Sequence, residues 1–332
     1  MKNLIFYSDG FGWGHVTRDA ALVRKWADEN KEGGVYWRVG KSVADVCKKL
    51  AQGRKNVIVM ECKEGIGFAA EGIGVNKEES KTSVNKWLGG AEKKIREEAE
   101  FLKKINADVV LSDIGVEGIY AAEKAGVKCF AVSNFTWKVI CKDLWKKWEE
   151  LHNFLDRGYE LADASFILPL SGKCEELPNK INTPFLVREM TDGGMVKSGK
   201  NKIAKFAFGK SVGKFGLPKL PKGWEKALPV PEKEIDGQNY IKGADVVLAK
   251  AAYGACSEAV QAGVPSLVCE REGFVESKDI AEGMVRNGWG WNIPLEKMEE
   301  FLEKWEERGK WDWKGAEFDG AEFIIKKLEE IV

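Results

Sequence analysis

Residues 244–276 read ADVVLAKAAYGACSEAVQAGVPSLVCEREGFVE, and this stretch decides the fold. It predicts an apolar strand over residues 245–248, a turn of small residues over 251–255 and a short helix over 256–262. A Gly-Val-Pro stop at residues 263–265 ends the helix, and a second apolar strand follows over residues 266–269. This is a βαβ unit with a Gly/Ala-rich turn at the carboxyl end of its first strand, where open α/β sheets bind ligands. Glu258, in the early turns of the helix, can accept hydrogen bonds from two neighbouring hydroxyls, such as those of a ribose.

A second glycine-rich turn stands near the start of the chain, where residues 9–18 read DGFGWGHVTR. An apolar strand over residues 4–7 precedes the turn, and a helix over residues 17–30 follows it. Backbone N–H groups at such a turn and helix start favour phosphate or another anion. The imidazole of His15 at its mouth can move a proton near neutral pH. The alternative is a plain βα turn whose glycines only permit positive φ, with His15 as a surface residue.

Strands and helices alternate through the first half of the chain, which predicts an α/β fold with helices on both faces of a parallel sheet. The expected strands are residues 4–7, 35–39, 57–60, 108–111, 129–132 and 165–168. The expected helices are residues 17–30, 43–52, 84–105 and 116–125. A further helix over residues 143–161 carries aromatic side chains that we assign to core packing, although an exposed edge could bind a sugar or acyl group. His152, on a polar stretch of that helix, is not expected to act in catalysis.

Length and composition restrict the class of protein. A chain of 332 residues is expected to form two domains. Its 52 basic and 52 acidic residues balance, which does not favour nucleic acid as a partner. No apolar run reaches the length of about 18 residues that a membrane span needs, so we expect no transmembrane segment. Seven cysteines without paired spacing fit reduced thiols in the cytoplasm, and two histidines without a ligand cluster argue against a metal site.

The composition changes after residue 170, where prolines punctuate a loop-rich region. We place the domain boundary near residues 168–185. The expected organisation is a first domain, a second domain and a C-terminal helix that packs back on the first domain: residues 1–168, 169–315 and 316–332. Residues 197–226 contain nine lysines and the single acid Glu225 around a strand-then-glycine element. This lysine-rich segment is either a solvated loop or a positively charged rim for a diphosphate.

Together these segments resemble GT-B glycosyltransferases, most closely the glycosyltransferase-like region of L-arabinokinases and less closely the lipid II-forming N-acetylglucosaminyltransferase group. The donor motif of that region reads K-x-G-Y-G-x-x-S-E-A, then G-x-P, then R-E-x-F-x-E. Its matches here are Lys250, Tyr253, Gly254, Ser257, Glu258, Ala259, Gly263, Pro265, Arg271, Glu272, Phe274 and Glu276. The family's turn, G-H-G-x-G-H-A-T-R, is matched by Gly10, Gly12, Gly14, His15, Thr17 and Arg18. Its N-F-S-W and S-D elements are matched by residues 133–137 and 112–113.

The resemblance implies two Rossmann-like domains that face each other across a cleft. The second would hold the nucleotide of a nucleotide-sugar donor, which we expect to be UDP-linked, and the first would hold the acceptor. Such enzymes stabilise the leaving diphosphate with amides, helix dipoles and side chains, so we expect no metal and no cofactor. The expected donor-binding residues are Gly12, Gly14, Arg18, Gly209, Lys210, Ser211, Lys250, Tyr253, Gly254, Ser257, Glu258, Arg271 and Glu276. The expected acceptor-side residues are Asn134, Phe135 and Trp137.

Proton removal from the acceptor needs a base, and His15 is the candidate. Asp113, at the end of a strand, is expected to orient His15 or to serve as an alternate base. The other interpretation makes Asp113 a helix N-cap before Val116.

Two residues depart from the family's pattern. Phe11 replaces the first histidine of the turn, which leaves His15 as its only histidine. Ala252 replaces a glycine of the donor loop, which leaves the donor's identity open. Because no sugar-kinase domain follows residue 332, we do not expect arabinokinase activity.

Two other classes of protein remain open. The turn also resembles that of nucleotide-sugar hydrolases in sialic-acid-like sugar pathways, in which the histidine activates water, and non-hydrolysing sugar-nucleotide epimerases share the architecture. Conversion of the donor without an acceptor would distinguish these enzymes from a transferase. The other class is a non-catalytic nucleotide-sugar-binding protein, which turnover with any acceptor would exclude.

The acceptor is not specified by the sequence, since lipid-linked, protein and small-molecule acceptors all fit. Residues 65–75, GIGFAAEGIGV, are apolar and glycine-rich and carry one charge, Glu71. They are a mobile acceptor loop, a contact that holds the protein peripherally on a membrane, or a packed loop.

Overall fold

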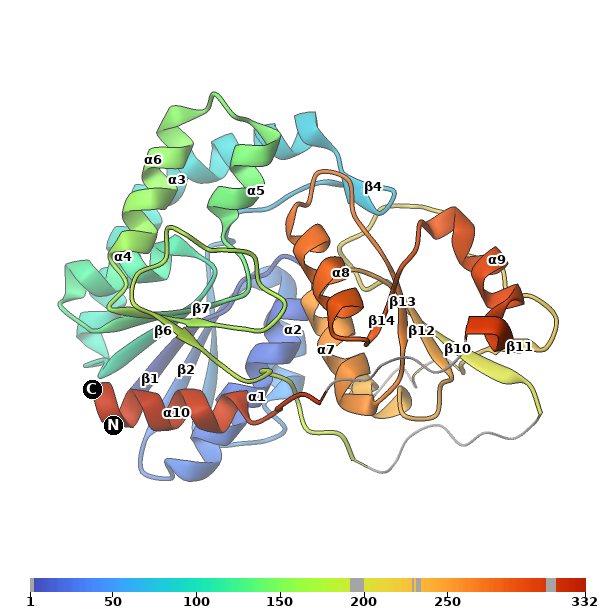
Figure 1. The fold of residues 1–332 in the computed structure, drawn as a ribbon. Helices are drawn as coiled ribbons and strands as arrows, with labels where there is room; N and C mark the ends of the chain where they lie inside the picture. Colours follow the sequence, from blue (N-terminus) through green and yellow to red (C-terminus); the bar gives the residue numbers. More distant parts are fainter. Residues whose placement is uncertain (1–2, 192–199, 229, 231–233, 309–314) are drawn as a thin grey trace.

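A computed structural model describes residues 3–191, 200–228, 230, 234–308 and 315–332. The chain forms two parallel β-sheets, each flanked by helices, that lie side by side (Figure 1). The predicted α/β architecture of two Rossmann-like domains is confirmed. The first three residues of the lysine-rich segment, 197–199, lie outside the described residues, as do residues 309–314 of the predicted second domain.

The first domain is built on a seven-stranded sheet in the order β3-β2-β1-β6-β7-β8-β9, with every pair parallel. Its strands are β1 Asn3–Tyr7, β2 Gly34–Gly40, β3 Val57–Cys62, β6 Val109–Asp113, β7 Cys129–Ser133, β8 Ala164–Ile167 and β9 Lys180–Asn182. Its helices are α1 Gly14–Glu29, α2 Lys41–Leu50, α3 Lys77–Lys104, α4 Val116–Ala125, α5 Trp137–Leu144 and α6 Glu149–Glu160. Because side chains alternate along β1, Leu4 and Phe6 join one apolar cluster, and Ile5 and Tyr7 join another on the opposite face.

The second domain has a five-stranded parallel sheet in the order β11-β10-β12-β13-β14. Its strands are β10 Lys202–Ala207, β11 Trp224–Lys226, β12 Val246–Lys250, β13 Ser266–Cys269 and β14 Gly290–Asn292. Its helices are α7 Tyr253–Ala262, α8 Glu276–Arg286 and α9 Met298–Glu303, with 3-10 turns η1 Gly237–Tyr240, η2 Leu295–Lys297 and η3 Trp305–Arg308. The predicted helix over residues 256–262 begins earlier, at Tyr253, because the extended Ala252 (φ −141°, ψ 140°) is its N-cap.

The strand order of each sheet reverses at one place, between β1 and β6 in the first and between β10 and β12 in the second. Loops that leave neighbouring strands on the two sides of such a point diverge and open a crevice at the carboxyl ends of the strands. The turn after β1 therefore meets Asp113 at the end of β6. In the second domain, the turns that follow β10 and β12 meet in the same way.

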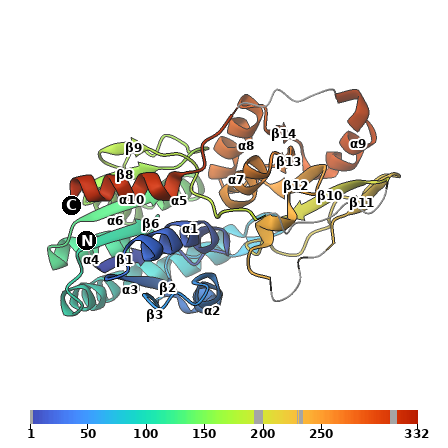
Figure 2. The same cartoon turned by 90° about the horizontal axis from the view of Figure 1, so that it is seen from below.

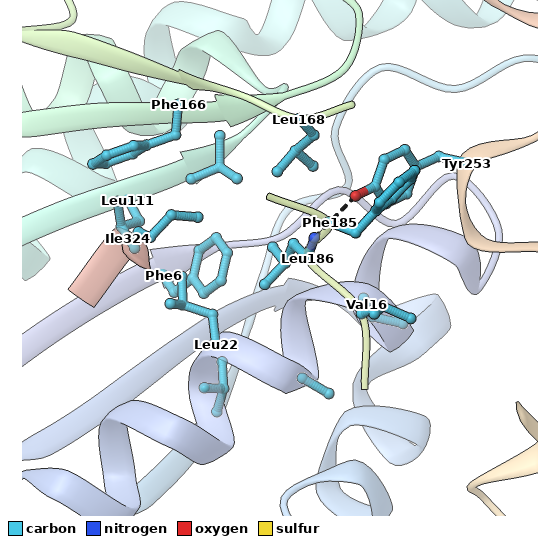
Figure 3. Close-up of a cluster of buried hydrophobic side chains, with 14 of the residues drawn as sticks. Phe6, Val16, Leu22, Leu111, Phe166, Leu168, Phe185, Leu186, Tyr253 and Ile324 are labelled. Carbon is cyan, nitrogen blue, oxygen red and sulfur yellow. Dashed lines mark hydrogen bonds between the residues drawn. The ribbon is translucent and has the colours of Figure 1, made fainter. Parts of the chain in front are cut away.

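One apolar cluster continues from the first domain into the second (Figure 3). Phe6 and Leu22 belong to it from the first domain, and Tyr253 and Met284 from the second. The hydroxyl of Tyr253 accepts a hydrogen bond from the backbone N–H of Leu186 at 3.0 Å, as the dashed line in Figure 3 marks. The two domains thus share a core.

The last helix, α10 Gly320–Ile331, returns from the second domain and lies alongside α1 of the first (Figure 2). Its buried side chains Ile324 and Leu328 belong to the shared cluster. The amine of Lys25 on α1 lies 3.3 Å from a carboxylate oxygen of Glu322.

The first sheet continues past residue 168 and ends inside the boundary region predicted near residues 168–185. The short strand β9 still pairs with β8 in the first sheet, so the sheet ends at Asn182. The loop-rich composition of this region hid a strand of only three residues.

The prediction of one helix over residues 143–161 is wrong, because the chain leaves the helical conformation at Trp145 (φ −138°, ψ 66°) and re-enters it at Glu149. The Trp145 ring stacks on Phe68 with the ring centroids 6.1 Å apart. The Trp145 carbonyl accepts a hydrogen bond from His152 Nε2 at 3.0 Å. His152 is therefore a buried residue that supports this break, and not part of a polar stretch.

The segment of residues 65–75 forms a hairpin of β4 Ala70–Glu71 and β5 Gly74–Val75, which reaches the second domain. The Gly72 carbonyl accepts a hydrogen bond from Gly213 N–H at 2.7 Å, and the Ile73 carbonyl accepts one from Arg271 Nε at 2.8 Å. These contacts pack the segment against the second domain. None of the described helices combines the length and apolar character that a bilayer span needs.

Candidate active site

A cavity of about 320 Å³ lies between the domains, where the two sheets reverse their strand order. From the first domain it is lined by Phe11, Trp13, Gly14, His15 and Arg18. From the second it is lined by Ala207, Gly209, Lys210, Ser211, Lys250, Ala252, Tyr253, Gly254, Ala255, Arg271, Phe274 and Glu276. A larger hollow of about 790 Å³ lies elsewhere, over the start of α3 and residues 144–148. We assign the site to the smaller cavity because the predicted catalytic and donor-binding residues converge there.

His15 stands in the first turn of α1 with Nδ1 at 2.8 Å from Asp113 Oδ2. An ionised carboxylate can only accept, so Nδ1 carries the hydrogen and Nε2 keeps the lone pair. The Arg18 guanidinium donates to the other oxygen of Asp113. Asp113 therefore orients His15. The helix-cap interpretation is wrong, because the N-cap of α4 is Gly115 and no side chain caps that helix.

Electrostatics tune this pair in opposite directions. Burial alone would raise the pKa of Asp113, but the charges of Arg18 and His15 outweigh burial and hold that pKa well below its usual range. Burial alone would lower the pKa of His15, but the Asp113 carboxylate outweighs burial and raises it. Because the pKa of His15 is raised, the neutral ring that can accept a proton becomes the main form only at a higher pH than for an ordinary histidine.

Asp9 is a second buried carboxylate of this region and was not among the predicted site residues. One oxygen accepts from Phe11 N–H at 2.7 Å and the other from Trp137 Nε1 at 3.1 Å. Burial raises the pKa of Asp9 to about 6, against the lowering effect of the His15 charge. Its position directly after β1, at the reversal of the strand order, was the signal in the sequence.

The opposite wall of the cavity comes from the loop after β10 and from β12. The amine of Lys250 donates to the Ser211 hydroxyl at 2.6 Å, and Arg271 Nη2 donates to the Ser211 carbonyl at 2.9 Å. The Lys210 amine lies 5.2 Å from the centroid of the Trp13 ring, across the cleft. Among the described lysines of the lysine-rich segment, Lys210 lines the cavity, so the predicted positively charged rim consists of Lys210 with the hydroxyl of Ser211.

Glycines let the two walls approach. Gly12 has φ +77°, and a methyl group on it would lie 3.2 Å from Ser211 Cβ. A methyl group on Gly254 would lie 3.6 Å from Gly14 Cα. The starts of α1 and α7 therefore face each other across the cavity, and both helix N-termini contribute positive potential to it.

Three predicted donor-binding residues, Gly12, Ser257 and Glu258, are not among those that line the cavity. One oxygen of Glu258 accepts from Arg188 Nη2 at 2.8 Å, and the Glu258 side chain is 18% exposed. Ser257 is fully buried, and its hydroxyl donates to the Gly254 carbonyl at 3.2 Å. Ser257 therefore supports the start of α7 from within.

The expected acceptor-side residues Asn134, Phe135 and Trp137 are buried, since each is at most 3% exposed. The Asn134 side chain accepts from Arg18 Nη1 at 2.8 Å and donates to Glu276 Oε1 at 2.7 Å. It thus ties the first domain to the second beneath the cavity.

Phe135 and Trp137 belong to an aromatic cluster that receives Phe274 of the second domain. Phe11 stacks on Phe274 with the ring centroids 5.5 Å apart, and Phe68 meets Phe274 edge-on at 5.9 Å. Phe11, Trp13 and Phe274 line the cavity although we assigned them no site role. The sequence did carry a signal for Phe11, because this residue stands in the turn where the family pattern has its first histidine. Its ring lines the cavity.

Comparison with known proteins supports this architecture. No family model matches the chain. The chain is 24% identical to the L-arabinokinase of Arabidopsis thaliana over 308 aligned residues, which cover 83% of this chain and 29% of that protein. It therefore spans less than a third of the length of the curated relative it matches.

Among solved structures, the chain is similar to the calicheamicin glycosyltransferase CalG4, with 18% identity, 92% and 89% of the two chains covered and a TM-score of 0.60. It is also similar to MurG of Acinetobacter baumannii, with 12% identity, 99% and 100% coverage and a TM-score of 0.60. A protein assigned as a UDP-N-acetylglucosamine 2-epimerase from Listeria monocytogenes shares 15% identity, with 100% and 98% coverage and a TM-score of 0.63. These similarities show that the chain has the GT-B fold.

Proposed function

We propose that this chain is a glycosyltransferase that moves a sugar from a nucleotide-sugar donor to an acceptor hydroxyl. We also propose that the donor is linked to UDP. One observation carries the proposal. The cavity between the domains has an oriented His15–Asp113 pair on one wall and a wall of cations and amides on the other. The first arrangement suits proton removal, and the second suits a departing diphosphate.

In this mechanism, His15 Nε2 takes the proton of the acceptor hydroxyl, and the hydroxyl oxygen forms a bond to the anomeric carbon of the donor sugar. The bond from that carbon to the diphosphate oxygen breaks, and its electron pair leaves with the nucleoside diphosphate. Lys250, Arg271 and the N-termini of α1 and α7 stabilise the added negative charge. We propose that this happens without a protein-bound metal, because these groups supply the positive potential.

The acceptor is proposed to enter from the first domain. A hollow of about 430 Å³ adjoins the cavity there and shares Phe11, Lys210 and Ser211 with it. The loop of residues 64–70 lines its other side, with Ser42 and Ser83 offering hydroxyls. This placement brings an acceptor hydroxyl toward His15 from the side opposite the donor wall.

A second candidate function is conversion of the nucleotide-sugar itself, by hydrolysis or epimerisation. The observation in its favour is that buried acidic groups, Asp9 and Glu276, lie close enough to His15 to interact with its charge. Several proton-transfer groups around one cavity suit proton abstraction from the donor as well as from an acceptor. The similarity to the protein assigned as an epimerase fits this alternative.

The test is a thermal-shift screen of the purified chain against UDP-, TDP-, GDP- and ADP-glucose, followed by a turnover assay with and without acceptors. We expect one donor to raise the melting temperature and release of its nucleoside diphosphate to require an acceptor. Conversion of the donor without acceptor would favour the second candidate. Failure of every nucleotide-sugar to bind would contradict both, and binding without turnover would leave a non-catalytic binding protein.

A further inference from the structure

Lys250 is a buried lysine at the end of β12 that lines the cavity and is 4% exposed. Its amine makes a hydrogen bond to the Ser211 hydroxyl at 2.6 Å. Across the described part of the chain, no carboxylate forms an ion pair with this amine. An ammonium group so placed lacks both bulk water and a counter-ion, which favours the neutral amine.

The groups that face Lys250 come from several elements. Arg271 after β13 opposes a charge on the amine, while Glu276 at the start of α8 and Cys269 on β13 favour one. Burial acts first and Arg271 adds to it, so the pKa of Lys250 is lowered to about 7. Ser211, from the loop after β10, accepts from the amine and does not titrate.

The other cations of the site are already committed. Arg18 forms ion pairs with Asp113 and Asp19. Arg271 remains charged at any working pH and lies 4.3 Å over the Phe274 ring, and two of its N–H groups bind the carbonyls of Ile73 and Ser211. The buried part of the donor wall therefore holds one permanent cation, while Lys210 lies exposed at the rim of the cavity. The diphosphate of a nucleotide-sugar carries two negative charges.

We propose that donor binding places a proton on Lys250, so that the ammonium formed there neutralises the second charge of the bound diphosphate. This inference rests on the proposed function, because the ligand that brings the charge is the nucleotide-sugar. The proton comes from solvent on binding and remains on the amine while the diphosphate departs. Lys250 thus contacts the leaving group as a cation, although it is largely neutral in the empty site above neutral pH.

The sign of the pH dependence follows from the pKa of about 7 in the free protein. Binding raises that pKa, so donor affinity is highest below pH 7 and falls as the pH rises from the free value toward the pKa of the bound state. Proton uptake should be about half a proton at pH 7 and about 0.9 at pH 8. Above pH 8 the affinity should fall by about tenfold per pH unit.

The experiment is isothermal titration calorimetry of the full chain with UDP-glucose, or with whichever of TDP-, GDP- and ADP-glucose binds. The diphosphate diester of these probes does not titrate in the working range. Titrations at about pH 6, 7 and 8, each in two buffers of different ionisation enthalpy, give the number of protons taken up. Lys250→Arg keeps a permanent charge and should bind without uptake. Lys250→Met should lose uptake and bind at least about tenfold more weakly.

The other titratable groups at the cavity provide the controls. His15→Gln and Asp9→Asn should retain the uptake, because the proton is assigned to Lys250. Uptake that persists in both Lys250 variants would overturn the inference, as would donor binding by the wild type without uptake at pH 8. Both of these outcomes leave the proposed function standing. Absence of nucleotide-sugar binding at every pH would overturn the proposed function together with the inference.

Discussion

The His15 ring depends on Arg18, one turn further along α1, and on Asp113, which is distant in sequence. Asp113 fixes the tautomer and raises the pKa of the ring, while Arg18 keeps the Asp113 carboxylate ionised. At the level of single residues, the candidate site is a set of neighbouring charges, and the charge of each group shifts the pKa of the group beside it.

We expect His15→Ala to lower the maximal rate by about 10²- to 10⁴-fold with donor affinity nearly intact, because a general base acts in the chemical step. The wild-type rate should fall as the pH falls, since only the neutral ring accepts a proton. The midpoint should lie above about 6.5, since Asp113 raises the pKa of His15. Steady-state rates between about pH 5 and 9 measure this, with Thr17→Ala on the same helical turn as control. An acid limb that survives in His15→Ala would show that His15 is only a turn residue, and Asp113 would become the candidate base.

Glu258→Gln tests the predicted ribose contact of a residue that is not among those lining the cavity. One carboxylate oxygen is held by Arg188, and the other makes no hydrogen bond within the described ranges. Because a hydrogen bond to a charged group contributes about 1.5–3 kcal/mol, we expect the Michaelis constant for the donor to rise about tenfold or more while the maximal rate changes little. Glu282→Gln, an exposed acid on α8, is the control. An unchanged Michaelis constant with a lower melting temperature would make Glu258 only the partner of Arg188.

At the scale of elements, the hairpin of residues 65–75 connects the first domain to the donor wall. It binds Arg271 and Gly213 through backbone carbonyls, and Val75 N–H donates to the Glu272 carbonyl at 3.2 Å. Arg271 is thus positioned jointly by both domains, since its other backbone partner is the Ser211 carbonyl.

Gly74→Ala should weaken this connection. A methyl group at Gly74 would lie 2.8 Å from the Glu272 carbonyl oxygen, so the hairpin must shift, at a cost of about 1–3 kcal/mol in the free energy of unfolding. Donor affinity should fall with it, because Arg271 loses its support from Ile73. Gly67→Ala is the matched control, since its methyl group would meet no atom within 4 Å. Urea unfolding and calorimetric donor binding measure both effects. Equal donor binding by the two variants would show that the hairpin does not position Arg271.

Local patterns in the sequence predicted most of these elements, because short apolar strands and amphipathic helices carry their own periodicity. The turn that carries His15 and the strand end that carries Asp113 could each be recognised from their local sequence. The reversal of the strand order between β1 and β6 then brings the two residues together. The break at Trp145 could not be predicted, since it depends on stacking against Phe68, far away in the chain. The burial of Asn134 and the docking of Phe274 likewise depend on the position of the second domain.

At the scale of the whole molecule, the shared apolar cluster makes the two domains one cooperative unit. We expect a single calorimetric unfolding transition. Met284→Ala should lower its stability by about 2–5 kcal/mol, because Met284 of α8 is fully buried in that cluster. Val285→Ala, at a neighbouring position that is 49% exposed, should change it little. Two separate transitions in Met284→Ala, with only one displaced, would show that the domains unfold independently.

The return of α10 to the first domain has a consequence for how the protein is made. The ribosome completes every strand of the first sheet long before it reaches residues 320–331, which supply Ile324, Ile325 and Leu328 to the cluster beside α1. Until those residues emerge, the nascent first domain exposes the apolar surface that α10 covers in the folded protein. Synthesis interrupted before α10 therefore yields a product prone to aggregation and dependent on chaperones, although all of its cavity-lining residues are present.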